Sequence, residues 1–298
     1  MTHSDKTVLV FGATGQQGGS VAAALRGAGW PVRALVRRPD SPAARALEAL
    51  GVDVVPGDLH KPSTLQSAMT GVYGVFSMQP SAGQPGSGIS DADEVHLGVA
   101  VADAAADQKV SHLVYTSSNA AGAATGIGHF ESKTRIETHV RGIPIDTTIV
   151  RPATFMEILL EPDFGLPDDR LTFFMRPDQR MQFIAVDDIG ALVAAVFADR
   201  DTFTGRTVQL AGDSLTGDQL ATAFSRSRDR PVSYRRFPDE ILRDHDLLRR
   251  LADAVDNGPL AGSADLDALR RLHPALLTFD AWLDRSAHQP LARAGSNP

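Results

Sequence analysis

The chain has 298 residues, of which 43% are hydrophobic, and its formal net charge is −7 at pH 7. This length allows one large domain or two smaller ones, and the acidic balance disfavours a nucleic-acid partner, which needs clustered cationic side chains. Cysteine is absent, which excludes disulfides, thiolate metal sites and a cysteine nucleophile. No signal peptide and no apolar run of roughly 18 residues is recognisable, so we expect a cytoplasmic protein without a membrane partner.

The first half of the chain alternates short apolar runs with amphipathic segments of helical length. The apolar runs predict strands at residues 7–11, 32–36, 52–56, 74–78, 112–116 and 146–151. The segments between them predict helices at residues 16–28, 42–50, 62–69, 92–107 and 129–141. Strands that alternate with helices and are apolar on both faces are typical of a parallel sheet covered on two sides. We therefore predict an α/β fold with a Rossmann-type, doubly wound parallel sheet.

The alternation breaks after Arg151-Pro152. Further strands are expected at 183–186 and 206–210, and further helices at 187–198 (capped by Asp187), 217–226, 239–255 and 278–285. We predict a nucleotide-binding domain made of residues 1–153 and 183–212. A smaller, discontinuous C-terminal lobe for a substrate or partner is expected from residues 154–182 and 213–288. The Gly/Ala/Ser/Pro-rich tail at 289–298 is expected to be disordered.

A glycine-rich turn follows the first predicted strand and opens the first predicted helix. Its sequence is Gly12-Ala13-Thr14-Gly15-Gln16-Gln17-Gly18. The three glycines suit a tight turn, backbone approach to a pyrophosphate, and close packing of helix on strand. The free N–H groups at the start of the helix favour an anion. We therefore predict a dinucleotide site at this turn; the alternative is a purely structural turn.

The end of the second predicted strand distinguishes the two nicotinamide cofactors. NAD binders place an acidic residue there to hydrogen-bond the ribose 2′-OH, whereas this strand ends in Arg37-Arg38. A guanidinium can pair with a 2′-phosphate that a carboxylate would repel. We therefore predict NADP(H), held at its 2′-phosphate by Arg37 with Arg38 beside it. The alternative is a pair of solvated surface arginines.

Two further loops are expected at the cofactor. Asp58 and Leu59 follow the third strand, where the loop passes the adenine, and Asp58 either accepts from the adenine amino group or caps the next helix. Gln79 follows the fourth strand and opens a Gly/Ser/Pro-rich loop at residues 81–88. This loop either folds over the cofactor or only connects two elements.

Taken together, these segments resemble the NmrA-like group of atypical short-chain dehydrogenases/reductases. The resemblance rests on residues 12–18, 37–38, 57–59, 112–118, 129–137, 150–156 and 184–190. It spans residues 7–215, while the C-terminal lobe matches only loosely. It implies a Rossmann fold and NADP(H). The group contains reductases of quinones, dyes and small carbonyl or aryl compounds, and also nucleotide sensors that regulate partner proteins.

The resemblance also implies a Ser and a Tyr-x-x-x-Lys pair. Ser118 follows the fifth strand where the Ser is expected, Lys133 occupies the Lys position, and His129 stands in place of the Tyr. In the family the Tyr moves a proton, and the Lys lowers the Tyr pKa and holds the nicotinamide ribose. The histidine departs from this pattern. His129 is therefore either a proton donor or a structural residue, and Ser118 either acts on a substrate oxygen or stabilises a turn.

Helical spacing places Lys133 on an inward stripe with Ile136 and Val140. A lysine there is unexpected unless a polar ligand lies nearby, and the alternative is a side chain that reaches solvent. Pro152 and Phe155 follow the sixth strand and are expected to approach and shield the nicotinamide. An apolar substrate pocket or ordinary core between the lobes is expected from Phe155, Met156, Leu159, Phe173, Phe174 and Met175. No histidine or carboxylate spacing indicates a metal site.

We therefore predict an NADPH-dependent oxidoreductase that reduces a small, fairly apolar acceptor such as a quinone, enone, imine or carbonyl. Its catalytic residues are expected to be Lys133, Ser118 and His129. The alternative is a non-catalytic, NADP(H)-sensing regulator that acts through a protein partner, and the missing Tyr favours this alternative. A homodimer is also left open.

Overall fold

The computed structural model describes residues 5–84 and 86–288. The predicted disordered tail at 289–298 therefore lies outside the described residues. The chain forms two units. The first comprises Met1–Ala124, Gly128–Arg151 and Ile189–Val208, and the second Thr125–Ile127, Pro152–Asp188 and Gln209–Pro298. The predicted roles, a nucleotide-binding domain and a lobe for a substrate or partner, stay predictions.

A seven-stranded sheet is the centre of the first unit. Its strands are β1 (Val8–Val10), β2 (Val32–Val36), β3 (Asp53–Pro56), β4 (Gly74–Ser77), β5 (His112–Thr116), β6 (Thr147–Pro152) and β10 (Thr207–Leu210). They lie in the order β10-β6-β5-β4-β1-β2-β3, and β1 to β6 pair in parallel. The direction of winding reverses between β1 and β4, the switch point at which open α/β sheets bind ligands. The predicted doubly wound Rossmann sheet is confirmed.

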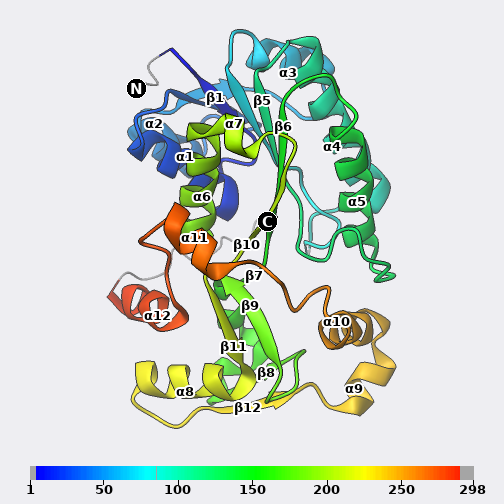
Figure 1. Ribbon diagram of the computed structural model, residues 1–298, viewed down its shortest axis with the longest axis vertical. Coiled ribbons are helices and arrows are strands. Elements are labelled where there is room, and N and C mark those ends of the chain that lie inside the picture. The colour runs from blue at the N-terminus through cyan, green and yellow to red at the C-terminus, as the bar shows by residue number, and fades with distance from the viewer. Residues whose placement is uncertain (1–4, 85, 289–298) are drawn as a thin grey trace. The chain divides into compact units, whose positions relative to one another are not determined.

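Helices cover both faces of this sheet (Figure 1). One face carries α1 (Gln16–Gly27), α2 (Pro42–Ala49) and α6 (Val186–Ala198), and the other α3 (Pro62–Met69), α4 (Asp91–Asp107) and α5 (Gly128–Val140). The short helix α7 (Arg200–Phe203) precedes β10. Strand residues such as Leu9 and Leu113 share one buried cluster with Val101 of α4 and Ile136 of α5. Burial from two sides explains the continuous apolar runs of these strands.

The second unit contains two small sheets. A three-stranded sheet has the order β11-β9-β7 and a two-stranded sheet the order β12-β8. The strands are β7 (Thr154–Phe155), β8 (Arg170–Phe173), β9 (Arg180–Ile184), β11 (Asp213–Thr216) and β12 (Ser233–Arg236). The helices are α8 (Gly217–Arg228), α9 (Asp239–Asp244), α10 (Asp246–Asp256), α11 (Leu266–Leu272) and α12 (Phe279–His288). Three 3₁₀ turns, Met156–Leu160, Pro162–Phe164 and Leu166–Asp168, connect β7 to β8.

Aromatic side chains form the core of this second unit. The Phe173 and Phe174 ring centroids lie 4.8 Å apart, and Phe164 packs 5.0 Å from Phe173. Phe173, Phe174 and Met175 are all buried, with at most 8% of each residue exposed. Of the two alternatives for these residues, the structure favours core packing over a pocket lining.

Several boundaries in the later part of the chain differ from the prediction. The helix expected at 187–198 begins at Val186, so Asp187 lies in its first turn and is not its cap. The helix expected at 239–255 is two helices, because His245 between them is extended, with φ −120° and ψ 96°. The strands β8, β11 and β12 were not predicted. Each has four residues, and β11 and β12 are mostly polar, so none of the three contains the continuous apolar run that marks a buried strand.

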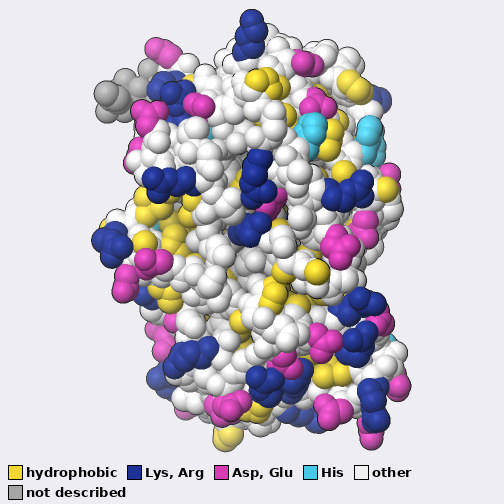
Figure 2. Space-filling view, turned by 45° about the vertical axis from the view of Figure 1, so that its right-hand side comes forward, with side chains coloured by type: hydrophobic (Ala, Val, Ile, Leu, Met, Phe, Trp, Pro, Cys, Tyr) yellow, Lys and Arg dark blue, Asp and Glu magenta, His cyan; other side chains and the backbone are white. Residues whose placement is uncertain are grey.

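Charges of both signs are interspersed on the face shown in Figure 2. On α10, for example, Arg250 Nε lies 2.6 Å from Asp246 Oδ2.

In the described ranges, no helix combines the length and apolarity that a bilayer crossing requires. Among the residues that the structure places, no three His, Asp or Glu side chains gather as metal ligands.

Candidate functional site

The predicted site residues of the first unit follow the carboxyl ends of neighbouring strands. The glycine-rich turn follows β1, and the other selected loops follow β2, β3, β4 and β5. In the parallel register Val10 lies opposite Ala34 and Phe76, and Ser77 lies opposite Tyr115. These loops therefore emerge at one edge of the sheet, around the switch point between β1 and β4.

The glycine-rich turn is shaped by its own close packing. Gly12 has φ +67°, a conformation that favours glycine. A Cβ on Gly18 would lie 2.3 Å from the Gly12 carbonyl oxygen, so only glycine lets α1 approach the turn this closely. A Cβ on Gly15 would meet only that same oxygen, at 3.4 Å. The protein's own packing therefore does not demand glycine at position 15, whereas a ligand lying against the turn would.

The first residues of α1 divide into an exposed and a buried set. Thr14, Gly15 and Gln16 are exposed, and Gly15 is the N-cap of α1 with no side chain to cap its first N–H groups. These N–H groups are therefore oriented to bind an anion. Gln17 is buried, and its Nε2 donates to Thr116 Oγ1 at 2.7 Å. The Gln17 side chain thus ties the turn to the end of β5, which leaves its backbone N–H for the predicted cofactor contact.

Arg37 and Arg38 are exposed directly after β2. Within the described chain, no hydrogen bond or ion pair engages the Arg37 guanidinium. The Arg38 carbonyl accepts from the Ser41 N–H at 3.1 Å and begins the turn into α2. Arg37 therefore carries an uncompensated positive charge at the sheet edge, as a 2′-phosphate site requires.

Asp58 shapes the loop after β3. Its Oδ1 accepts from the His60 N–H at 3.0 Å, while the N-cap of α3 is Lys61. Asp58 therefore forms the turn that precedes α3 and does not cap that helix. Leu59 is partly buried against the core of the first unit. The predicted adenine contacts of both residues stay predictions.

Lys133 has a protein partner that sequence reasoning missed. Its Nζ lies 2.5 Å from Glu94 Oε1 and donates to Ser81 Oγ at 3.0 Å. Glu94, on α4, is only 2% exposed. The inward position of Lys133 is therefore explained in part by a buried carboxylate. The sequence did carry a signal for the inward position of Glu94, because this residue shares one helix face with Leu97, Gly98 and Val101.

His129 packs at the start of α5. Its ring centroid lies 4.3 Å from that of Phe130, and a Cβ on Gly83 would lie 2.7 Å from the ring. Burial and the nearby Lys133 ammonium lower the His129 pKa below its usual value, against the opposing effect of Glu94 and Asp91. At neutral pH the imidazole is therefore mainly neutral, so it retains one N–H donor but is a poor source of a proton.

The remaining predicted side chains after β4 and β5 have local partners. Gln79 is buried, and its Nε2 donates to Ser77 Oγ at 2.8 Å. The Ser118 hydroxyl accepts from the Ala120 N–H at 3.4 Å. This contact is long for a hydrogen bond, so the turn holds the Ser118 hydroxyl only weakly.

A second buried carboxylate, also missed from the sequence, fixes the other end of α5. Glu137 is 0% exposed. It accepts from Arg151 Nε at 2.8 Å and Nη2 at 2.7 Å, and from Arg141 Nη2 at 2.6 Å. Burial opposes its ionisation, but hydrogen bonds from Arg151 and Arg141 hold its pKa below the usual range. This cluster anchors α5 to β6 and so helps to position Lys133.

Pro152 and Phe155 belong to the second unit. Pro152 ends β6, and Phe155 lies in β7, opposite Ile184 of β9. Their predicted approach to the nicotinamide would involve both units and stays a prediction.

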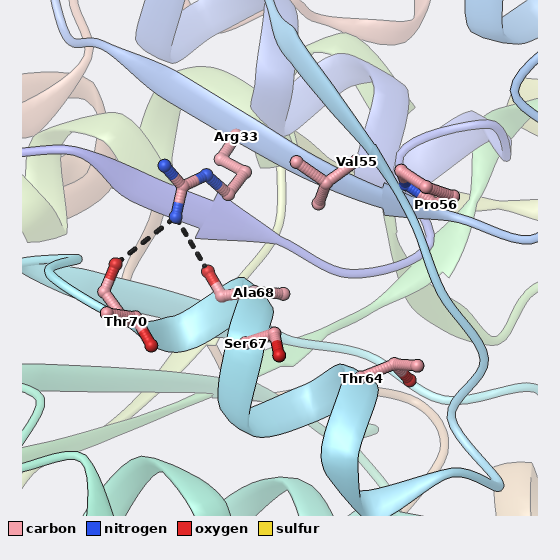
Figure 3. Close-up of a pocket in the computed structure, with 7 residues that line it drawn as sticks. All are labelled: Arg33, Val55, Pro56, Thr64, Ser67, Ala68 and Thr70. Carbon is pink, nitrogen blue, oxygen red and sulfur yellow. Dashed lines mark hydrogen bonds between the residues drawn. The ribbon is translucent and has the colours of Figure 1, made fainter.

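A pocket of about 390 Å³ lies elsewhere on the first unit, beside β2, β3 and α3 (Figure 3). Arg33 lines this pocket, and its guanidinium donates to the Ala68 carbonyl at 3.0 Å and to the Thr70 carbonyl at 3.3 Å. Arg33 also pairs with Asp53 at 2.8 Å. The pocket contains no predicted site residue, and its cation is already satisfied.

Comparisons with known proteins agree with this fold. The sequence matches the model of the NmrA-like family over residues 4–257. The NmrA-like family domain-containing oxidoreductase FrzB of Cladobotryum sp is 33% identical over 258 residues, which cover 76% of this chain and 76% of that protein.

Two solved structures have the same fold. NmrA, a negative transcriptional regulator, in complex with NADP has a TM-score of 0.77 and 20% identity, with 96% of each chain covered. Triphenylmethane reductase of Citrobacter sp., complexed with NADP(H), has a TM-score of 0.74 and 20% identity, with 94% of this chain and 99% of that chain covered.

Proposed function

Because the chain belongs to the NmrA-like family, we propose that it is an oxidoreductase that binds NADP(H) at the carboxyl edge of its parallel sheet. The pyrophosphate lies on the turn from Gly12 to Gly18, and Arg37 pairs with the 2′-phosphate. The observation that carries this proposal is the glycine-rich turn after β1 together with the uncompensated charge of Arg37 after the neighbouring strand β2. The proposed location is the cytoplasm.

The relatives support a redox role. FrzB is named an oxidoreductase, and the Citrobacter structure is that of a reductase with NADP(H). The proposed acceptor is small and fairly apolar, such as a quinone, enone, imine or carbonyl. When bound, the reduced nicotinamide supplies a hydride.

The chain's own residues orient the reactants and handle protons. An ammonium has three N–H donors, and Lys133 directs two of them at Glu94 and Ser81. The third is available to a ribose hydroxyl. Ser118, whose hydroxyl is weakly held, donates a hydrogen bond to the acceptor oxygen. His129 is mainly neutral and serves as a hydrogen-bond donor, so solvent delivers the proton where the product needs one.

Turnover tests this proposal. NADPH consumption is measured by absorbance against quinones, enones, imines and carbonyls, for the wild type and for Lys133→Ala. The matched control is Arg135→Ala, which removes an exposed cation from the same helix. We expect turnover with at least one acceptor class, its loss in Lys133→Ala, and its retention in Arg135→Ala. Equal turnover in all three proteins would refute the role of Lys133.

A non-catalytic NADP(H)-sensing regulator is the second candidate. The specific observation in its favour is a largely neutral histidine, His129, at the position where short-chain dehydrogenases commonly have a proton-donating tyrosine. NmrA, a negative transcriptional regulator bound to NADP, has the same fold. Tight NADPH binding without turnover of any acceptor would favour this candidate, with a protein partner as its target.

A further inference from the structure

Glu94 lies at the junction of three segments of the first unit. One carboxylate oxygen, Oε1, pairs with Lys133 Nζ of α5 at 2.5 Å. The other, Oε2, accepts from Ser81 Oγ at 3.1 Å and from the Ala82 N–H at 3.2 Å, both in the loop after β4. Lys133 also donates to Ser81 Oγ at 3.0 Å. One buried side chain thus joins α4, α5 and this loop.

The α4–α5 contact is already close without this ion pair. One turn further along α4, Gly98 lies against Ile136 of α5, and a Cβ on Gly98 would meet the Ile136 side chain at 2.6 Å. A buried ion pair is often no more stabilising than apolar residues of similar volume. Helix packing alone therefore does not account for a charged pair that is almost fully buried, with side-chain exposures of 16% for Lys133 and 3% for Glu94.

We propose that Glu94 is a positioning residue for the nicotinamide end of the cofactor site, because it fixes Lys133 and the Ser81–Ala82 loop in one arrangement. This inference rests on the proposed function. With two N–H groups committed to Glu94 and Ser81, the orientation of the ammonium is set, and its third N–H points to a fixed position. A lysine without this carboxylate would lose that orientation.

The experiment compares two ligands. NADPH reaches the nicotinamide end, whereas the fragment 2′,5′-ADP carries the 2′-phosphate but has no nicotinamide ribose. In Glu94→Gln, which keeps the size of the side chain and removes its charge, we expect NADPH to bind about 10-fold more weakly, the equivalent of about 1.4 kcal/mol. Binding of 2′,5′-ADP should be unchanged.

A matched control is available on the same two helices. Asp103 of α4 pairs with His139 of α5 at 2.6 Å, and both side chains are exposed. Asp103→Asn removes an α4–α5 ion pair at the surface and should leave the affinity for both ligands unchanged. Glu94→Asp keeps the charge but withdraws it by one methylene. It gives a milder test with the same expected ligand difference if Glu94→Gln does not fold.

A double-mutant cycle shows whether Glu94 acts through Lys133. In a Lys133→Met background, we expect Glu94→Gln to change the NADPH dissociation constant by less than about twofold, since coupled residues are not additive. Three results would each overturn the inference: an equal loss of affinity for both ligands in Glu94→Gln, an unchanged NADPH affinity in that variant, or fully additive effects of Glu94→Gln and Lys133→Met on NADPH binding. Failure of the wild type to bind either ligand would instead overturn the proposed function.

Discussion

Gly18 and Gly15 lie in the same turn, but their substitution by alanine should have different consequences. A Cβ at position 18 would lie 2.3 Å from the Gly12 carbonyl oxygen, so α1 or the turn must move by about 1 Å to restore ordinary contact. Such overpacking costs about 1–3 kcal/mol, and the better helix propensity of alanine returns up to about 1 kcal/mol. We expect Gly18→Ala to lower the free energy of unfolding by roughly 1–2 kcal/mol.

Gly15→Ala is the matched control for stability. Its Cβ meets the same oxygen at 3.4 Å, and the residue has an extended conformation with φ −97°. Its free energy of unfolding should therefore stay within about 0.5 kcal/mol of the wild type, because the loss of glycine entropy in the unfolded chain offsets a poorer N-cap. The added methyl group faces the proposed pyrophosphate, however, so NADPH affinity should fall at least about 10-fold.

Urea unfolding and calorimetric titration with NADPH measure the two effects separately. We expect Gly18→Ala to lose both stability and affinity, and Gly15→Ala to lose affinity alone. Wild-type stability in Gly18→Ala would contradict the packing argument. Wild-type affinity in Gly15→Ala would contradict the proposed place of the pyrophosphate.

Two other predictions concern buried charge. Burial lowers the pKa of His112 to about 4 in the folded protein, whereas the unfolded chain has the ordinary value of about 6.5. Stability is therefore complete above pH 6.5 and is lost as the pH falls towards 4, because the unfolded chain binds a proton that the folded protein does not. Between about pH 7 and pH 5 the wild type should lose about 2 kcal/mol more folding free energy than His112→Asn in urea unfolding; parallel losses would refute this assignment. Glu137→Ala leaves Arg151, whose side chain is 17% exposed, without its carboxylate, and should lower the free energy of unfolding by about 3–5 kcal/mol. The double variant Glu137→Ala/Arg151→Met should recover much of that loss, and no recovery would show that the charge is not its cause.

The sequence predicted the first unit well because one physical signal dominates there. Strands buried on both faces, such as Val8–Val10, need continuous apolar runs, and the intervening helices have capping and proline signals such as Ser41-Pro42. The glycine-rich turn was recognisable for a similar reason, since Gly18 is required by contacts between neighbouring segments of the chain.

The second unit was predicted less well because its strands are short and pair at a distance in sequence. Ser233–Arg236 forms β12 by pairing with β8, more than fifty residues earlier, and nothing in Ser-Tyr-Arg-Arg marks a strand. The break at His245 also has no glycine or proline signal. For β12, pairing with a distant strand outweighs local preference.

The sequence pointed to the candidate site residues, whose roles stay predictions, but it did not show the protein partners of their side chains. Lys133 was selected because it occupies the Lys position of the Tyr-x-x-x-Lys pattern, and its place on an apolar helix stripe supported that choice. Its pairing with Glu94, however, links residues on two helices. Gln17 was selected as a cofactor contact. Its side chain donates to Thr116, so the predicted contact would use its backbone N–H. Spacing within one element shows which residues share a face, but not which residue of another element they contact.

Calorimetric titration of the purified protein with NADPH and with NADH tests the central claim most directly. We predict that NADPH binds at least about 10-fold more tightly, and that Arg37→Glu abolishes this preference while leaving NADH binding intact. Tighter binding of NADH by the wild type, or an equal loss of both ligands in Arg37→Glu, would contradict the assignment of the 2′-phosphate site to Arg37.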